Sequence, residues 1–103
     1  MLPKINPTNT PAWKSLQNHS AEMKSTKMKD LFASDKERFS KLHTRLDDII
    51  FDYSKNIIND TTLSLLNQLA EESKVKDAIA AMFNGDMINE TENRSVLHIA
   101  LRN

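Results

Sequence analysis

Hydrophobic positions near the start of the chain are few, and they follow a polar, proline-containing stretch over residues 1–9. We expect that stretch to be an extended lead-in. Thr10 and Pro11 then indicate a helix start, because a capping hydroxyl precedes a proline at the first helical position. The sparse apolar face that follows predicts a surface helix running toward Met28, with a break near His19.

A second short helix is predicted over residues 30–41. Its apolar anchors are Leu31, Phe32 and Phe39. The four charged residues 35–38, which end in Arg38, are expected on its outer, solvated face.

The spacing then changes to a period of two over residues 48–54, where Ile49, Phe51 and Tyr53 alternate with more polar positions. Alternation with β-branched and aromatic residues predicts a strand. We expect residues 43–46 to be its hairpin partner, with the turn at Asp47-Asp48.

Helical spacing returns in the second half of the chain. Residues 59–62 form an N-cap cluster, and residues 63–70 carry a leucine stripe. A break near Ser73-Lys74 leads to another helix from Val75, which Asn84-Gly85 would cap. Val75, Ile79, Met82 and Phe83 occupy one face of that helix. The five methionines, and the leucines between Leu63 and Phe83, are interpreted as core filling.

The last apolar stripe predicts a helix from Thr91. Its inward residues would be Val96, Leu97, Ala100 and Leu101. No stop signal follows that stripe, so we expect the helix to continue beyond Asn103. The fold class is therefore predicted as mostly α with a short β-hairpin (α+β), a single partial domain over residues 1–103.

Bulk composition excludes several classes of function. Fourteen Lys and Arg balance fourteen Asp and Glu, which argues against a nucleic-acid or anionic-membrane partner. The chain has no cysteine and one glycine, so it offers neither a disulfide framework nor a glycine-rich phosphate loop. Because no long apolar run is present, we expect a cytoplasmic protein without a membrane span.

Histidine is the first candidate for chemistry near neutral pH. The three histidines, His19, His43 and His98, have no ligand-like spacing, so no metal site is predicted. His98 is the strongest candidate, although a partly buried packing histidine is the favoured interpretation. Arg94 and Arg102 could hold an anion, but ion pairing with Glu90 or Glu92 is favoured. We assign no catalytic, cofactor-binding or metal residue.

Six segments, spread from end to end, resemble the phosphoglucose isomerase (glucose-6-phosphate isomerase) family. They are Ile5-Asn6-Pro7-Thr8, Ala12-Trp13, Asp30-Leu31-Phe32-Ala33, Arg38-Phe39-Ser40, Asp52-Tyr53-Ser54-Lys55-Asn56 and Met82-Phe83-Asn84-Gly85. The run from Gly85 through Val96-Leu97-His98 to Arg102 is similar too. Ile57 departs from the pattern, because members often carry arginine there, and this puts one surface contact in doubt.

The resemblance implies an N-terminal part of a cofactor-free, homodimeric enzyme with two doubly wound α/β domains. That family interconverts glucose 6-phosphate and fructose 6-phosphate in glycolysis and gluconeogenesis, through a glutamate base and an enediol. Its catalytic and phosphate-binding segments would lie beyond Asn103, so we expect the 103 residues alone to be inactive. We expect apolar faces without partners, especially around Trp13 and the last helix. The alternative is a complete helical interaction module without catalysis.

Overall fold

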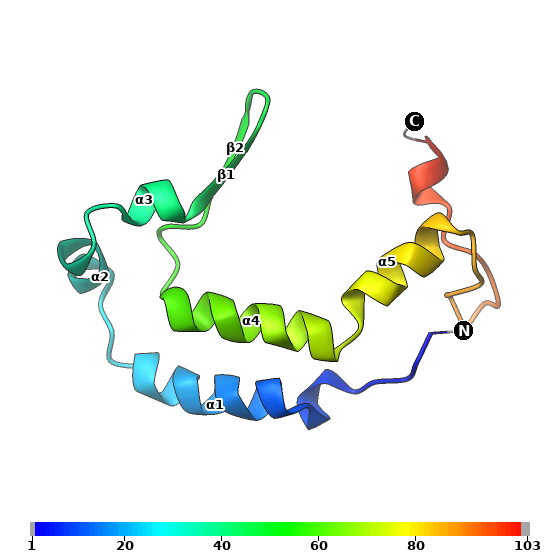
Figure 1. Ribbon diagram of the computed structural model, residues 1–103, viewed down its shortest axis with the longest axis horizontal. Helices are drawn as coiled ribbons and strands as arrows, with labels where there is room; N and C mark the ends of the chain where they lie inside the picture. The colour runs from blue at the N-terminus through cyan, green and yellow to red at the C-terminus, as the bar shows by residue number, and fades with distance from the viewer. Residues whose placement is uncertain (1, 102–103) are drawn as a thin grey trace. The chain divides into compact units, whose positions relative to one another are not determined.

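The computed structural model describes residues 2–101, with helices and one two-stranded sheet (Figure 1). Helices make up most of its regular structure, which confirms the predicted class of mostly α with a short hairpin. The chain divides into two compact units. One unit is formed by residues 15–65, and the other by the residues up to Lys14 together with those from Leu66 onward.

The lead-in is not extended throughout, because Pro7–Asn9 form a turn of 3-10 helix, η1. The Asn6 side chain explains this turn: its Oδ1 accepts the N–H of Thr8 at 3.1 Å, and Pro7 fixes the next φ. Helix α1, Pro11–Met23, follows. Thr10 caps it as predicted, with Oγ1 accepting the N–H of Trp13 at 3.2 Å.

The predicted break near His19 is wrong, because α1 is continuous through Met23. His19 is 7% exposed, and its ring bonds to Thr62 from α4, so the residue anchors the helix where a break was expected. The helix ends well before Met28, in a turn closed by the Thr26 N–H and the Met23 carbonyl at 3.0 Å.

The single helix predicted over residues 30–41 is two helices, α2 at Met28–Ser34 and α3 at Arg38–Lys41. Asp35 separates them with an extended backbone, φ −144° and ψ 102°. Its Oδ1 accepts the N–H of Glu37 at 2.9 Å. An aspartate side chain that bonds the backbone two residues on competes with helix, and this explains the split.

The predicted hairpin is confirmed. Strand β1, His43–Leu46, pairs antiparallel with β2, Ile49–Asp52, in a register that places Leu46 opposite Ile49. The turn lies at Asp47-Asp48, and Asp47 has φ 51°, a left-handed value that aspartate tolerates.

The two helices predicted in the second half are also confirmed, as α4, Asp60–Glu72, and α5, Val75–Phe83. Asn59 caps α4, with Oδ1 accepting the N–H of Thr62 at 3.0 Å. Lys74 ends α4 in the left-handed conformation, φ 60°. Gly85, φ 77°, follows the C-cap residue Asn84 of α5.

No helix begins at Thr91, so that prediction is wrong. Asn89 and Arg94 form a backbone bridge across a turn in which Asn93 has φ 56°, and a left-handed residue interrupts a helix. The only regular element beyond it in residues 2–101 is a 3-10 turn, η2, His98–Leu101. Leu97 is 59% exposed and Ala100 is exposed, so neither points inward, while Val96 is half-buried. The Leu101 side chain lies outside the described residues.

The hydrophobic core is small. Its buried apolar side chains, within the part of the chain described, are Ala12, Leu42 and Ala81. The prediction of core filling was therefore wrong for Leu66 and Met87, which are 45% and 58% exposed. On the apolar face of α5, Val75, Ile79 and Phe83 are 43%, 50% and 66% exposed. Apolar faces without partners were expected especially around Trp13 and the last helix. Trp13 is half-buried, whereas Leu97 in the last segment is 59% exposed, and further exposed apolar side chains belong to the hairpin and α5.

Candidate functional site

The three histidines lie apart and in different surroundings. His19 is buried in α1, His43 is half-buried with its ring stacked on Phe39 at 4.6 Å between centroids, and His98 is exposed. The expectation of a partly buried His98 is therefore wrong, because the helix that would have packed it does not form. Within residues 2–101 no group of three His, Cys, Asp or Glu could hold a metal ion.

Arg94 does not form the predicted ion pair. Among the described residues Glu90 pairs with Lys4 instead, at 3.4 Å, and Glu92 accepts a hydrogen bond from the Asn89 amide at 3.4 Å. Arg94 contributes through its backbone, which exchanges two hydrogen bonds with Asn89. Arg102 lies outside the described residues.

Arg38, which the sequence pattern predicted on an outer face, is a buried side chain with several hydrogen bonds. It is 4% exposed. Its guanidinium donates three hydrogen bonds to main-chain carbonyls: Nε to Ser54 at 2.8 Å, Nη2 to Asn56 at 2.7 Å and Nη1 to Ile58 at 2.9 Å. The planar fork of arginine suits such a set of acceptors, and burial of the charge is tolerated because each of its three nitrogens donates a hydrogen bond.

The arginine thereby fixes the segment that leaves the hairpin. Carbonyls at alternate positions of residues 54–58 all turn toward α3, and Ser54 itself is 1% exposed. The ring of Phe32 lies beneath the guanidinium, with its centroid 5.5 Å from Cζ. No alternation or spacing in the sequence separates this arginine from the neighbouring charged residues, which is why the pattern missed it.

Asp35 and Lys41 form an exposed ion pair beside this arginine, with Nζ 2.9 Å from Oδ2. The lysine hydrogen bond, followed by that of the Glu37 N–H, holds the pKa of Asp35 below its ordinary value of 3.8. The same bond raises the pKa of Lys41. Both shifts favour the charged forms, so the pair is structural and neither group is prepared to exchange protons near neutral pH.

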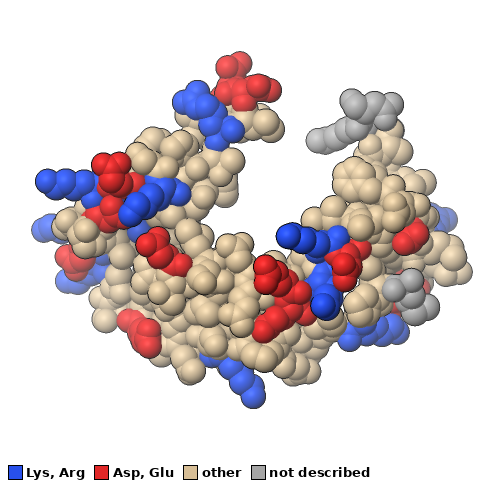
Figure 2. All heavy atoms as spheres, viewed as in Figure 1, with Lys and Arg blue, Asp and Glu red and all other residues tan. Residues whose placement is uncertain are grey.

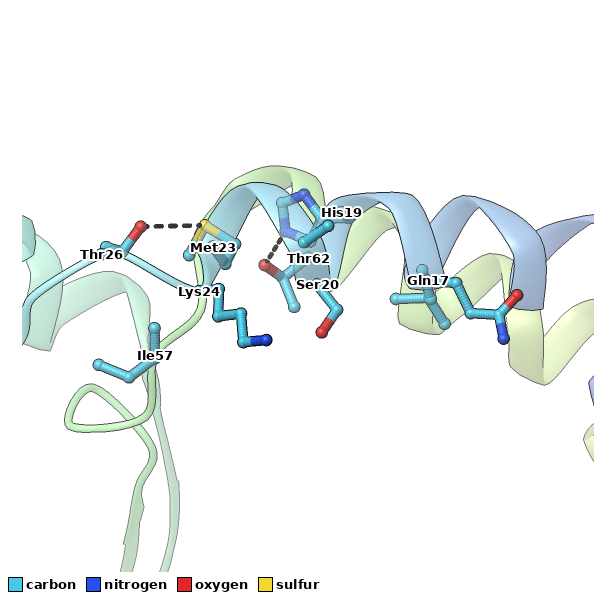
Figure 3. A pocket seen from close by; sticks show the side chains of 10 residues that line it. Gln17, His19, Ser20, Met23, Lys24, Thr26, Ile57 and Thr62 are labelled. Atoms are coloured by element: carbon cyan, nitrogen blue, oxygen red, sulfur yellow. Dashed lines mark hydrogen bonds between the residues drawn. The ribbon is translucent and has the colours of Figure 1, made fainter.

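A second buried polar cluster joins the C-terminal half of α1 to the start of α4. His19 Nε2 lies 2.5 Å from Thr62 Oγ1 (Figure 3). Thr62 also exchanges hydrogen bonds with Asn59 in a reciprocal helix cap. Because the Thr62 hydroxyl has one proton and that proton can go to Asn59, a His19 that donates from Nε2 satisfies the whole cluster. Its role is positional.

An open groove of about 660 Å³ runs beside this cluster (Figure 3). Its lining includes Gln17, Ser20, Lys24 and Ile57. Ile57, where the resembling family often has arginine, places an apolar side chain there that is 43% exposed. The ionisable residues of the lining are His19 and Lys24, and the ring of His19 is bonded to Thr62.

Charges elsewhere are mixed. In Figure 2 acidic side chains lie among basic ones on the visible face, as the equal numbers of each in the sequence require. None of the helices within residues 2–101 has the length and hydropathy to cross a membrane. The described residues thus form two buried polar clusters, one around Arg38 and one around His19.

Comparison with known proteins gives these clusters a context. The model of the phosphoglucose isomerase family matches residues 52–103, about half of the chain. The chain belongs to the phosphoglucose isomerase family. It is also 54% identical, over all 103 residues, to glucose-6-phosphate isomerase of Desulforapulum autotrophicum. The chain spans only 19% of that relative's length.

Arg38 lies in one of the segments that resemble the phosphoglucose isomerase family. Two of the segments that resemble the family, Arg38-Phe39-Ser40 and the run 52–56, are distant in sequence, and the Arg38 guanidinium joins them. The family-like sequence here therefore maintains a backbone arrangement.

Proposed function

We propose that this chain is the N-terminal part of a glucose-6-phosphate isomerase that interconverts glucose 6-phosphate and fructose 6-phosphate. The proposal rests on one observation: the chain is 54% identical to a curated enzyme of that name over all 103 residues. The intact enzyme would act in glycolysis and gluconeogenesis, in the cytoplasm and as a homodimer, with a sugar phosphate as its substrate and no metal or organic cofactor.

In this proposal the 103 residues supply structure, and the remainder of the enzyme supplies chemistry. The absence of a catalytic constellation among the described residues supports this division. Exposed large apolar side chains support it as well, because Val75, Ile79 and Phe83 follow one another at i, i+4 and i+8 along α5. A stripe with that spacing is typical of a packing face, and its exposure indicates that another surface covers it in the enzyme.

A chimera tests the proposal directly. The 103 residues would replace the matching 19% of the Desulforapulum autotrophicum enzyme, and fructose 6-phosphate formation from glucose 6-phosphate would be measured. We expect activity comparable with the unmodified relative, and none above background for the 103-residue chain alone. An inactive chimera beside an active relative would reject the proposal, and so would robust turnover by the chain alone.

A further inference from the structure

One face of the β-hairpin is apolar and stands in solvent. The pairs Leu46–Ile49 and Thr44–Phe51 are directly opposite in the register, so their side chains share a face. Leu46, Ile49 and Phe51 are 69%, 68% and 65% exposed. Tyr53 extends the same face, with its ring 5.4 Å from that of Phe51.

The opposite face is polar. There His43 pairs with Asp52, and Arg45 pairs with Ile50. The hairpin is therefore amphipathic, and its two faces suit different surroundings: water on the side of Arg45 and Asp52, and an apolar surface on the side of Phe51. Two strands alone are marginally stable in water, so the apolar side is where a stabilising contact is needed.

We propose that this apolar face docks on an apolar surface of the portion of the isomerase chain that lies outside the 103 residues. The proposal rests on the proposed function. About four-fifths of the matched relative's length has no counterpart in this chain. In the proposal, the corresponding part of the isomerase contains the surface on which the hairpin docks. The docking face defined by Leu46, Ile49, Phe51 and Tyr53 carries no charged side chain, so the surface that receives it is uncharged as well.

The size of the face favours an occupant within the same polypeptide over a second copy bound through it. Each strand has four residues, which at about 3.3 Å per residue gives a length of roughly 13 Å. A pair of such strands, about 5 Å apart, falls far short of the roughly 800 Å² per partner that a stable interface buries. A covalently linked partner does not need that area, because linkage makes the contact intramolecular.

Neighbouring isoleucines in β2 provide a matched test in the chimera. Ile49 lies on the docking face and Ile50 on the polar face, and in the isolated chain they are 68% and 46% exposed. Ile49→Thr and Ile50→Thr make the same chemical change and keep a β-branched residue. We expect Ile49→Thr to lower the Tm of the chimera by several degrees and Ile50→Thr to lower it much less.

Equal Tm shifts in an active chimera would overturn the docking proposal and leave the proposed function intact. An inactive unsubstituted chimera would reject the proposed function, and the docking proposal with it. Hydrogen exchange gives a second measurement that does not depend on a variant. Amides of residues 43–52 should exchange more slowly in the chimera than in the 103-residue chain, and equal rates would contradict docking.

The second-copy alternative is tested by sedimentation of the 103-residue chain. We expect no dimer that depends on the hairpin. A concentration-dependent dimer that Phe51→Thr abolishes and Ile50→Thr preserves would overturn the proposal, because the apolar face would then belong to a homotypic contact.

Discussion

At the residue scale, a single buried cation organises much of the unit formed by residues 15–65. Arg38 donates to three carbonyls, those of Ser54, Asn56 and Ile58, of which the Asn56 carbonyl also accepts the Ile58 N–H at 2.9 Å. A buried carbonyl that loses its donor costs about 1–3 kcal/mol, so the three bonds together outweigh any one apolar contact in this small core.

Replacement of this side chain should therefore be costly. We expect Arg38→Ala to lower the free energy of unfolding by about 2–4 kcal/mol, as for a buried network that loses its donor. Urea titration of the 103-residue chain, followed by far-UV circular dichroism, measures the change. Arg45→Ala, at an exposed strand position, is the matched control and should stay within about 0.5 kcal/mol. Similar losses for the two variants would show that the carbonyl contacts contribute little.

The Asp35–Lys41 pair predicts a pH dependence of small size, because both side chains are substantially exposed. The pKa of Asp35 is lowered in the folded chain, so its contribution is present above the ordinary value of 3.8 and is lost as the pH falls through the folded value. The Tm of the unsubstituted chain should exceed that of Asp35→Asn at neutral pH, and the gap should close in acid below that value. A gap in Tm that stays constant down to strongly acidic pH would show that the ionisation of Asp35 is not its cause.

At the element scale, sequence patterns predicted most of the regular structure and missed what long-range contacts decide. The hairpin and the boundaries of α4 and α5 follow from local signals, namely period-two spacing, the Asn59 cap and Gly85. The break expected at His19 does not occur, because the His19 ring is hydrogen-bonded to Thr62, which lies 43 positions away in the sequence.

The candidate site shows the same limit. Arg38 sits in a run of charged residues, and no pattern distinguishes a buried guanidinium from solvated neighbours. The helix expected at Thr91 had the right apolar spacing, but the left-handed Asn93 and the bridge between Asn89 and Arg94 turned the chain. The clusters around Arg38 and His19 depend on tertiary contacts, which no local pattern in the sequence reports.

The start of α1 offers a prediction at this scale. Its first turn has no acidic residue, and the carboxylate of Glu72, at the end of α4, accepts the N–H of Ala12 at 2.8 Å. A negative group at a helix N-terminus is favourable. We expect Glu72→Ala to cost about 1 kcal/mol in urea titration, typical of a lost cap. Glu71→Ala removes the same charge from the same turn of α4 without that contact, and its effect should be smaller. Equal effects would show that the contact between Glu72 and the Ala12 N–H contributes little.

At the scale of the whole molecule, the stripe on α5 should behave oppositely alone and in the enzyme. Ile79 is 50% exposed in the chain, so Ile79→Gln should change its free energy of unfolding by no more than about 0.5 kcal/mol. If the remainder of an isomerase covers the stripe, the same substitution in the chimera removes a buried isoleucine, whose burial contributes about 1.5–3 kcal/mol. The test therefore compares the loss in free energy of unfolding that Ile79→Gln causes in the chain with the loss that it causes in the chimera, each measured by urea titration. Ala80→Gln, at the next and also exposed position of α5, supplies the control and should be mild in both. Equal costs of Ile79→Gln in chain and chimera would mean that the α5 stripe stays in solvent in the enzyme, and that its apolar character serves something other than packing.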